Sequence, residues 1–213
     1  MMQLSEWQKT LKPKRCLIYN ASVQDGHDRW TPFPIGMGYK IATFTGSLEE
    51  TQIGSHNQDV LCAITTDTDM YRRPNGINRK VIVENLKKNG IENKLIDSSQ
   101  YFRELPKYRF VISPEGNGID CHRHYEALMA GCIPIVEKHP AVEEKYHGCP
   151  ILWTNDYSEI TIQYLNQKYE EMFYTKFNFG SLYLQHYPPA IQKQIKENGN
   201  YWGRRLTGKY WYT

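Results

Sequence analysis

The residues with the most specific chemical pattern lie in one segment of this 213-residue chain, FVISPEGNGIDCHRHYEALMAGCIPIV at positions 110–136. The segment reads as a strand, a loop with two glycines, a helix and a second strand. Gly116 and Gly118 let the backbone approach a ligand closely. The predicted helix directs its N-terminal amides and the positive end of its dipole toward the same place. The pattern therefore predicts a site for an anionic group such as a diphosphate.

The predicted helix at 120–130 has an apolar side and a polar side. Helical spacing puts four residues on the apolar stripe: Cys121, Tyr125, Leu128 and Cys132. Arg123 and Glu126 then lie together on the other side, where they can face a ligand or form an exposed i,i+3 ion pair. Asp120 can belong to the site or serve only as the helix N-cap, and the two glycines can serve only to build a turn.

A second group of polar residues follows the predicted strand at 59–65. Four basic residues surround the turn Pro74-Asn75-Gly76: Arg72, Arg73, Arg79 and Lys80. In a parallel sheet this turn lies at the same edge as the glycine loop, so Arg79 or Arg73 can help to bind phosphates, unless they are solvated surface charges. Asp67-Thr68-Asp69 has the spacing of a Mn²⁺ or Mg²⁺ site, although this pattern also occurs by chance in loops.

The elements that position these residues follow a β/α rhythm. Short apolar runs predict strands at 16–19, 59–65, 93–97, 109–113, 132–136 and 150–153, and helical spacing predicts helices at 78–89, 98–105, 120–130 and 141–146. Continuous apolar strands separated by helices indicate an α/β fold with a Rossmann-like parallel sheet and helices on both faces.

Three parts of the chain are predicted. Residues 1–58 contain the first strand, a long polar loop and a further strand at 40–45. Residues 59–157 carry the regular β/α pattern and form the Rossmann-like domain. Residues 158–213 are helical to about position 173 and end in an aromatic, basic tail, which we expect to pack back on that domain.

Composition excludes several classes of protein. The net charge of +3, from 26 basic and 23 acidic residues, is too balanced for a nucleic-acid-binding surface. No stretch approaches the ~20 apolar residues that a membrane span needs. The five cysteines are odd in number and lie mostly in apolar runs, which favours reduced thiols. These features predict a cytoplasmic protein without a membrane span, or a soluble piece of something larger.

The stretch SPEGNGIDCHRHYEALMAGCIPIV resembles the signature of exostosin-type glycosyltransferases, in which a strand and a glycine loop precede an Arg-x-x-Glu-Ala helix and a Gly-Cys-Ile-Pro strand. The resemblance is strong over 110–136, weak back to 59 and forward to 158, and does not cover the first 58 residues. It implies the donor-binding domain of a GT-B fold, in which two Rossmann-like domains face a cleft. This chain has room for one such domain, so residues 1–58 and the tail form a minimal acceptor part, or another domain or subunit supplies it.

The resemblance also implies roles for individual residues. Arg123 would contact the donor diphosphate and Glu126 would bind the ribose hydroxyls, which suits a planar guanidinium and a carboxylate. Gly116, Asn117 and Gly118 would line the loop, with Asn117 as an extra donor to phosphate or sugar.

The implied activity is transfer of a sugar from a nucleoside-diphosphate sugar to a hydroxyl of a glycan or glycoprotein, with inversion and without a metal or other cofactor. Such a transfer needs a general base, and the loop at 20–36 offers Asp28 and Asp25, with His27 behind them. These three residues can also merely build a turn. Two alternatives stay open: a metal-dependent, GT-A-like enzyme using Asp67 and Asp69, and a non-catalytic nucleotide- or glycan-binding module.

Overall fold

The computed structural model describes residues 1–10, 18–19, 32–38 and 56–212. Its centre is a parallel sheet with the order β2-β3-β4-β5, which confirms the predicted Rossmann-like α/β fold. The strands are β2 (Gln58–Leu61), β3 (Tyr108–Ile112), β4 (Ile133–Glu137) and β5 (Leu152–Thr154). The two central strands are buried along almost their whole length, as continuous apolar runs require when both faces of a sheet are covered.

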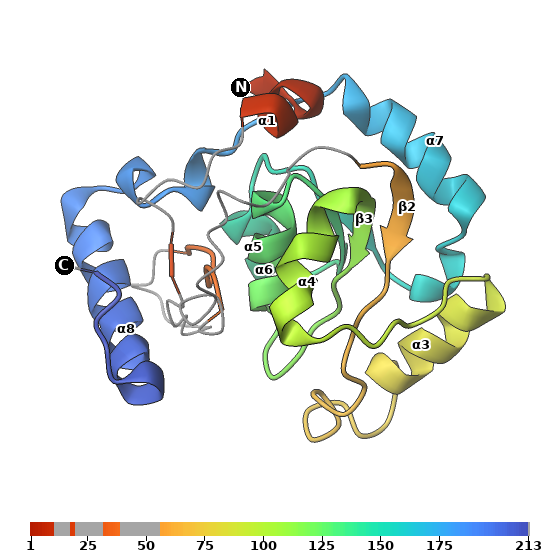
Figure 1. Ribbon diagram of the computed structural model, residues 1–213, viewed down its shortest axis with the longest axis horizontal. Helices are drawn as coiled ribbons and strands as arrows, with labels where there is room; N and C mark the ends of the chain where they lie inside the picture. The colour runs from red at the N-terminus through yellow and green to blue at the C-terminus, as the bar shows by residue number, and fades with distance from the viewer. Residues whose placement is uncertain (11–17, 20–31, 39–55, 213) are drawn as a thin grey trace.

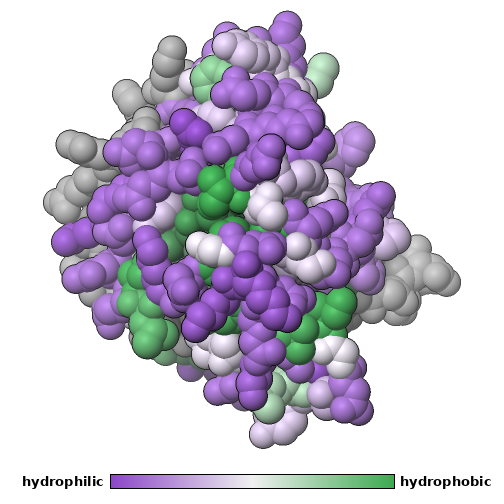
Figure 2. All heavy atoms as spheres, turned by 90° about the vertical axis from the view of Figure 1, so that its right-hand side faces the viewer, coloured by the Kyte–Doolittle hydropathy of each residue, from purple (hydrophilic) through white to green (hydrophobic). Residues whose placement is uncertain are grey.

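Helices cover both faces of this sheet. In Figure 1, α4, α5 and α6 lie on one side of the strands, and α3 and α7 lie on the other. The helices of the described residues are α1 (Leu4–Thr10), α3 (Arg79–Lys88), α4 (Ser98–Glu104), α5 (His122–Met129), α6 (Pro140–Lys145), α7 (Ile162–Phe173) and α8 (Pro189–Thr207). Short 3₁₀ turns connect them at Leu105–Lys107, Tyr157–Glu159, Gly180–Leu182 and Leu184–His186. The outer face around α3 and α7 is mainly hydrophilic with small apolar patches, as amphipathic covering helices should be (Figure 2).

The direction of chain progression reverses at β2. Cys62, just after β2, forms a parallel bridge with Asn93, and β3 occupies the other edge of β2. The chain therefore leaves β2 outward through α3 and returns through α4 to the opposite side. In open parallel sheets, ligands bind beside the carboxyl ends of the strands at such a reversal. The loops after β2 and β3, which carry most of the predicted site residues, meet at this point.

The N-terminal segment packs against the residues that follow α7. Strand β1 (Met2–Gln3) pairs antiparallel with β6 (Lys176–Phe177). In α1, Trp7 stacks on Phe179 with ring centroids 4.0 Å apart. These contacts join the N-terminal part to the part that follows α7. The predicted part boundaries at 58 and 157 stay predictions.

The C-terminal tail is mostly helical. Helix α8 runs to Thr207 and ends at Gly208, whose φ of 72° is a left-handed cap conformation. The residues after it fold back, because the backbone amides of Trp211 and Tyr212 donate to the Asn200 side chain. The aromatic and basic residues of the tail thus belong to α8 and to the short segment after it, which runs back along the helix.

The predicted strand at 93–97 is wrong. Asn93 makes only the bridge to Cys62, and the Lys94 amide donates to the Cys62 carbonyl. Leu95 is almost fully exposed, so its apolar side chain does not mark a buried strand. The strand predicted at 59–65 is shorter than expected and ends at Leu61.

Two further predictions fall wholly or partly outside the described residues. For the strand at 16–19, the structure describes only Ile18 and Tyr19, and Tyr19 forms a single parallel bridge with Met37. The strand predicted at 40–45 lies outside the described residues.

No helix among the described residues is both long enough and apolar enough to cross a membrane. The cytoplasmic location stays a prediction.

Candidate functional site

A cavity of about 490 Å³ opens at the carboxyl edge of the sheet, and we call it the sheet-edge pocket. Its walls come from the loops after β2 and β3 and from the start of α5, with Ile35 and Lys145 added from elsewhere. Seven residues predicted from the sequence to bind a donor line it: Arg79, Gly116, Asn117, Gly118, Asp120, Arg123 and Glu126. The structure therefore brings together residues that are spread over 48 positions of the chain, from 79 to 126.

The glycine loop forms a tight turn against α3. The Gly116 amide donates to the Gly118 carbonyl at 2.9 Å. A Cβ atom at Gly116 would sit only 3.0 Å from Nη2 of Arg79, which is closer than side chains normally tolerate. Asn117 is exposed at the tip of the turn. The glycine is thus needed to let the guanidinium of Arg79 lie against the loop backbone.

Arg79 fastens the two loops of the pocket to each other. Its Nε donates to the Glu115 carbonyl at 2.7 Å, Nη2 to the Pro114 carbonyl at 3.0 Å and Nη1 to the Thr65 carbonyl at 3.3 Å. Burial lowers the pKa of Arg79, but arginine stays charged in proteins. The side chain therefore shapes the pocket and brings a positive charge to its wall.

Arg123 is a cation of the pocket with unused hydrogen-bonding capacity. Its Nε donates to the Tyr101 hydroxyl at 3.3 Å, and the guanidinium carbon lies 5.7 Å from the centre of the Tyr101 ring. Its Nη1 is buried and has no acceptor among the described residues. An unsatisfied buried donor costs roughly 1–3 kcal/mol, and more for a charged group. An anionic ligand in the pocket would supply the missing acceptor.

Glu126 contacts the segment 32–38, which crosses the first turns of α5. The Gly38 amide donates to Oε1 of Glu126 at 3.1 Å, and His122 Nδ1 lies 2.9 Å from the Gly36 carbonyl oxygen. Burial raises the pKa of Glu126. No ion pair joins Glu126 to Arg123, although both side chains are described. The alternative of a simple surface ion pair between them is therefore wrong.

Asp120 is buried and contacts groups from several elements. It is not the N-cap of α5, because Cys121 occupies that position. Its carboxylate accepts from the Tyr146 hydroxyl at 2.9 Å and from the Ile35 amide at 3.2 Å. Two cations also face it, His124 Nδ1 at 3.3 Å and Lys145 Nζ at 3.6 Å. Burial alone would raise the pKa of Asp120, but His124 and the other partners lower it. Its oxygens are thus occupied by the protein.

His124 carries a positive charge inside the fold. Its Nε2 lies 2.9 Å from the Ser113 carbonyl oxygen, which can only accept, so this nitrogen bears a proton. Its Nδ1 faces the Asp120 carboxylate. Burial opposes the charge, but the neighbouring Cys121 and Asp120 outweigh it and raise the pKa of His124 to about 10. The sequence did not predict a role for His124, because sequence spacing does not show that Asp120 and Ser113 face its ring.

The charges around the pocket do not cancel. Arg79, Arg123 and Lys145 line it, and the imidazolium of His124 lies behind Asp120. The only acidic residues among its described lining residues are Asp120 and Glu126. The excess of positive charge favours an anionic ligand.

Arg73, also predicted to bind phosphate, lies outside the described lining of the pocket. Its guanidinium pairs with Asp69 at 2.7 Å, with Glu137 at 3.0 Å and with Glu115 at 3.7 Å. Three carboxylates at the sheet edge therefore hold this arginine, and sequence spacing gave no sign of Glu137 among them.

The Asp67-Thr68-Asp69 motif does not present two available carboxylates. Asp69 is fully buried, and its oxygens accept from the Arg79 amide and from the guanidinium of Arg73. Asp67 is exposed. Within the described part of the chain, no cluster of three or more His, Cys, Asp or Glu side chains could hold a metal ion. The candidate bases Asp25, His27 and Asp28 lie outside the described residues.

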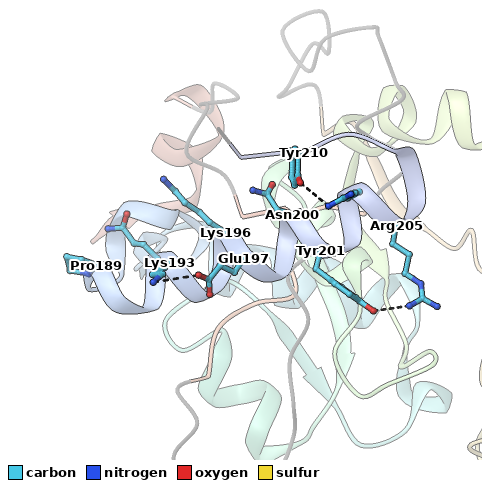
Figure 3. Close-up of a pocket in the computed structure, with 10 residues that line it drawn as sticks. Pro189, Lys193, Lys196, Glu197, Asn200, Tyr201, Arg205 and Tyr210 are labelled. Atoms are coloured by element: carbon cyan, nitrogen blue, oxygen red, sulfur yellow. Dashed lines mark hydrogen bonds and ion pairs between the residues drawn. The ribbon is translucent and has the colours of Figure 1, made fainter.

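A second, larger cavity of about 1000 Å³ lies along α8, and we call it the α8 cavity. Figure 3 shows its residues along one side of the helix, with Tyr210 added from the returning tail. Four of them are basic, and one is acidic: Lys193, Lys196, Arg204 and Arg205, against Glu197. Arg205 Nη1 donates to the Tyr201 hydroxyl at 2.8 Å, and Arg204 Nη1 to that of Tyr210 at 3.2 Å. None of the residues predicted to bind the donor lies there.

Comparison with known proteins does not name the site. No protein-family model matches the sequence, and no curated protein matches it significantly. The function must therefore be argued from the geometry of the pocket and from the resemblance of residues 110–136 to a known signature.

Proposed function

We propose that the chain is a glycosyltransferase that binds the diphosphate of a nucleotide-sugar donor in the sheet-edge pocket. The observation that carries this proposal is the guanidinium of Arg123, whose Nη1 is buried at the pocket without an acceptor among the described residues. A diphosphate oxygen is a natural partner for this planar, permanently charged group. The position of the pocket at the reversal of strand order supports the same ligand.

The surrounding backbone would complete the phosphate site. The Gly116–Gly118 turn lies beside the N-terminus of α5, whose first amides have no partner within the helix. These amides and the guanidinium would stabilise the negative charge that develops on the departing nucleoside diphosphate. Arg79 and Lys145 would add charge from the other walls.

Glu126 would recognise the ribose. One of its oxygens accepts from Gly38, and a carboxylate can accept further hydrogen bonds at both oxygens. The ribose diol would therefore bind beside the existing contact or replace it. Because burial raises the pKa of Glu126, a donor hydroxyl or cation in the pocket would help to keep it ionised.

The chemistry would be a single displacement with inversion. A hydroxyl oxygen of the glycan or glycoprotein acceptor attacks the anomeric carbon, the bond from that carbon to the diphosphate breaks, and a general base takes the hydroxyl proton. Asp28 and Asp25, with His27 behind them, remain the predicted bases. The described residues contain one parallel sheet, so the acceptor part would come from residues 1–58 and the tail, or from another domain or subunit.

The proposed enzyme would work without a metal, because the pocket itself supplies cations. The GT-A-like alternative needs Asp67 and Asp69 to face one ion, and the burial of Asp69 between Arg73 and the Arg79 amide argues against it. The remaining alternative is a binding module that holds nucleotides or glycans without catalysis. No observation favours a nucleic-acid partner.

The test is a turnover assay on the full chain with UDP-, GDP- and dTDP-sugars and a mixture of glycan acceptors. We expect release of one nucleoside diphosphate in the presence of EDTA, detected by mass spectrometry. Release only after Mn²⁺ is added would support the GT-A-like alternative. Tight nucleotide binding without hydrolysis or transfer would support the binding module.

A further inference from the structure

The cations of the α8 cavity form two groups along one face of the helix. The lining residues of α8 recur every three to four positions, which puts their side chains on the same face. Lys193 and Lys196 lie near the start of α8 (Figure 3). Arg204 and Arg205 lie near its end. From the first cation to the last, the helix rises by about 18 Å. The cavity is therefore suited to an elongated ligand that meets positive charge at both ends.

Two tyrosines hold the arginines of the second group. The Tyr201 hydroxyl accepts from Arg205, and the Tyr210 hydroxyl accepts from Arg204 (Figure 3). The guanidinium carbon of Arg204 also lies 5.8 Å from the centre of the Tyr210 ring. Neither arginine has a carboxylate partner among the described residues. A guanidinium has five N–H donors, so most of these donors stay available to a ligand. Both tyrosines are more than half exposed, so their rings are accessible beside the two cations.

Close packing of the tail on α8 builds the wall that carries Tyr210. The Asn200 side chain accepts from the Trp211 and Tyr212 amides and donates to the Tyr212 carbonyl at 2.9 Å. A Cβ atom at Gly203 would lie 2.9 Å from the Lys209 carbonyl oxygen and 2.9 Å from the Trp211 ring. Glycine inside a helix costs roughly 0.5–1 kcal/mol relative to alanine, and here it admits the tail. Tyr210 is thus held against the helix.

The hydrogen-bonding groups of the cavity are mostly donors. The four cations supply ammonium and guanidinium N–H groups, whereas Glu197 is the only acidic lining residue and already pairs with Lys193. Carboxylate and sulfate groups only accept hydrogen bonds, so they match this supply better than neutral hydroxyls or amides, which also donate. Each exposed ionic contact is weak, so a ligand must make several at once. These properties favour a chain that carries repeated anionic groups.

We propose that the α8 cavity binds an anionic glycan, a chain of sugars that carry carboxylate or sulfate groups. Its acid groups would contact the two groups of cations, and the apolar face of a sugar ring would pack on Tyr201 or Tyr210. An acidic peptide has suitable charges, but its backbone amides are donors that find few acceptors here. A flat lipid surface would not fill a concave cavity of about 1000 Å³. The α8 cavity shares no described lining residue with the sheet-edge pocket, so this proposal does not depend on the proposed function.

The experiment measures binding of a fluorescently labelled galacturonic acid hexamer to the full chain by fluorescence anisotropy. We expect competition by the unlabelled hexamer and by a sulfated carrageenan hexasaccharide. Maltohexaose, a neutral chain of the same length, should not compete at the same concentration. Equal competition by maltohexaose would overturn the proposal, because the cations would then play no part. Tighter binding of hexaglutamate, of a six-nucleotide oligo(dT) or of phosphatidylserine vesicles than of either acidic glycan would also overturn it.

Variants place the binding on α8. Arg204→Gln combined with Arg205→Gln should weaken binding of the galacturonic acid hexamer about fivefold or more, because two ionic contacts are lost. The matched control is Lys87→Gln combined with Lys88→Gln, an exposed basic pair at the end of α3 that changes the net charge equally. Tyr201→Ala should also weaken binding, whereas Tyr201→Phe keeps the ring and should retain most of it. Equal losses in the two double variants, or no loss in Tyr201→Ala, would contradict the proposed site.

Discussion

The sheet-edge pocket and the α8 cavity show that cavity size and chemical capacity are separate properties. The α8 cavity is about twice as large, yet its charges lie on an exposed helix face, where the Lys193–Glu197 pair is 3.8 Å apart and both side chains are more than half exposed. Such pairs contribute little energy because water and salt screen them. In the sheet-edge pocket, by contrast, Arg79, Asp120 and Lys145 are buried and contact protein partners. A buried, preorganised charge is worth more to a ligand than an exposed one.

The two regions also differ in how many elements build them. The α8 cavity draws its described lining from one helix and the tail that returns along it. The sheet-edge pocket needs two loops of the sheet, the start of α5, Lys145 of α6 and Ile35. A site assembled from several elements keeps its geometry only while the fold is intact, so changes there should affect stability and binding together.

The largest expected effect is on protein stability, and it compares a buried charge of the sheet-edge pocket with an exposed charge of the α8 cavity. Asp120→Ala removes the carboxylate that faces His124, Lys145 and the Tyr146 hydroxyl. Breaking a buried charge network of this kind costs about 3–5 kcal/mol. Glu197→Gln, on the exposed face of α8, should change the free energy of unfolding by less than ~0.5 kcal/mol. Urea unfolding followed by circular dichroism measures both, and equal effects would break the comparison.

The second prediction concerns binding. Arg123→Ala should weaken nucleoside-diphosphate binding by about 2–3 kcal/mol, roughly 30- to 150-fold in affinity, because a charge-assisted contact is lost. The parent nucleoside should be barely affected. Lys196→Ala, a basic residue of the α8 cavity, is the matched control and should leave nucleotide affinity unchanged. Fluorescence-detected competition measures the ratio, and a larger loss in the Lys196 variant would move the site to α8.

The third prediction is a pH dependence that comes from the buried histidine. The folded-state pKa of His124 is about 10, above its ordinary value of about 6.5, so the folded protein holds this proton more tightly than the unfolded chain. The stabilisation is fully present below pH 6.5, and it should be lost as the pH rises toward 10. The slope can reach ~1.4 kcal/mol per pH unit. Urea unfolding at pH 7, 8, 9 and 10 should show this fall in wild type and a flatter profile in His124→Gln.

The smallest effect is expected at Glu126. Glu126→Gln keeps the shape of the side chain and one acceptor oxygen, so it should weaken nucleoside and nucleotide alike by about 1 kcal/mol, roughly fivefold. An equal loss of affinity for nucleoside and nucleotide would indicate a ribose contact, because both carry the ribose and only the nucleotide carries phosphate. If titration shows that only the nucleotide is weakened, the ribose role is incorrect.

The sequence predicted the parts of this site whose signal is local. The strand, glycine loop and helix at 110–136 follow one another within a single βαβ unit, and the structure places Gly116, Arg123 and Glu126 together as expected. Arg79 was also placed correctly, because parallel strands bring their carboxyl ends to one edge.

The parts that the sequence did not predict depend on contacts between distant segments. Asp120 is tied to Ile35 and Lys145, and Arg73 is tied to Glu137, 64 positions further along the chain. Cys121 was expected on the apolar stripe of α5 but is its N-cap residue, because the helix starts at His122, two residues later than predicted. The predicted strand at 93–97 failed for the same reason. Its apolar residues suggest a strand, but they do not show whether a neighbouring strand can pair with it, and the structure has only the single bridge between Asn93 and Cys62.

The most direct test of the account is a calorimetric titration of UDP, GDP and dTDP into the full chain in the presence of EDTA. If Arg123 and the glycine loop hold a diphosphate, one of the three should bind at a single site without a metal, and its affinity should fall with rising salt as expected for an ionic contact. Absence of binding by all three in EDTA, with binding restored by Mn²⁺, would contradict the account and favour a metal-dependent site.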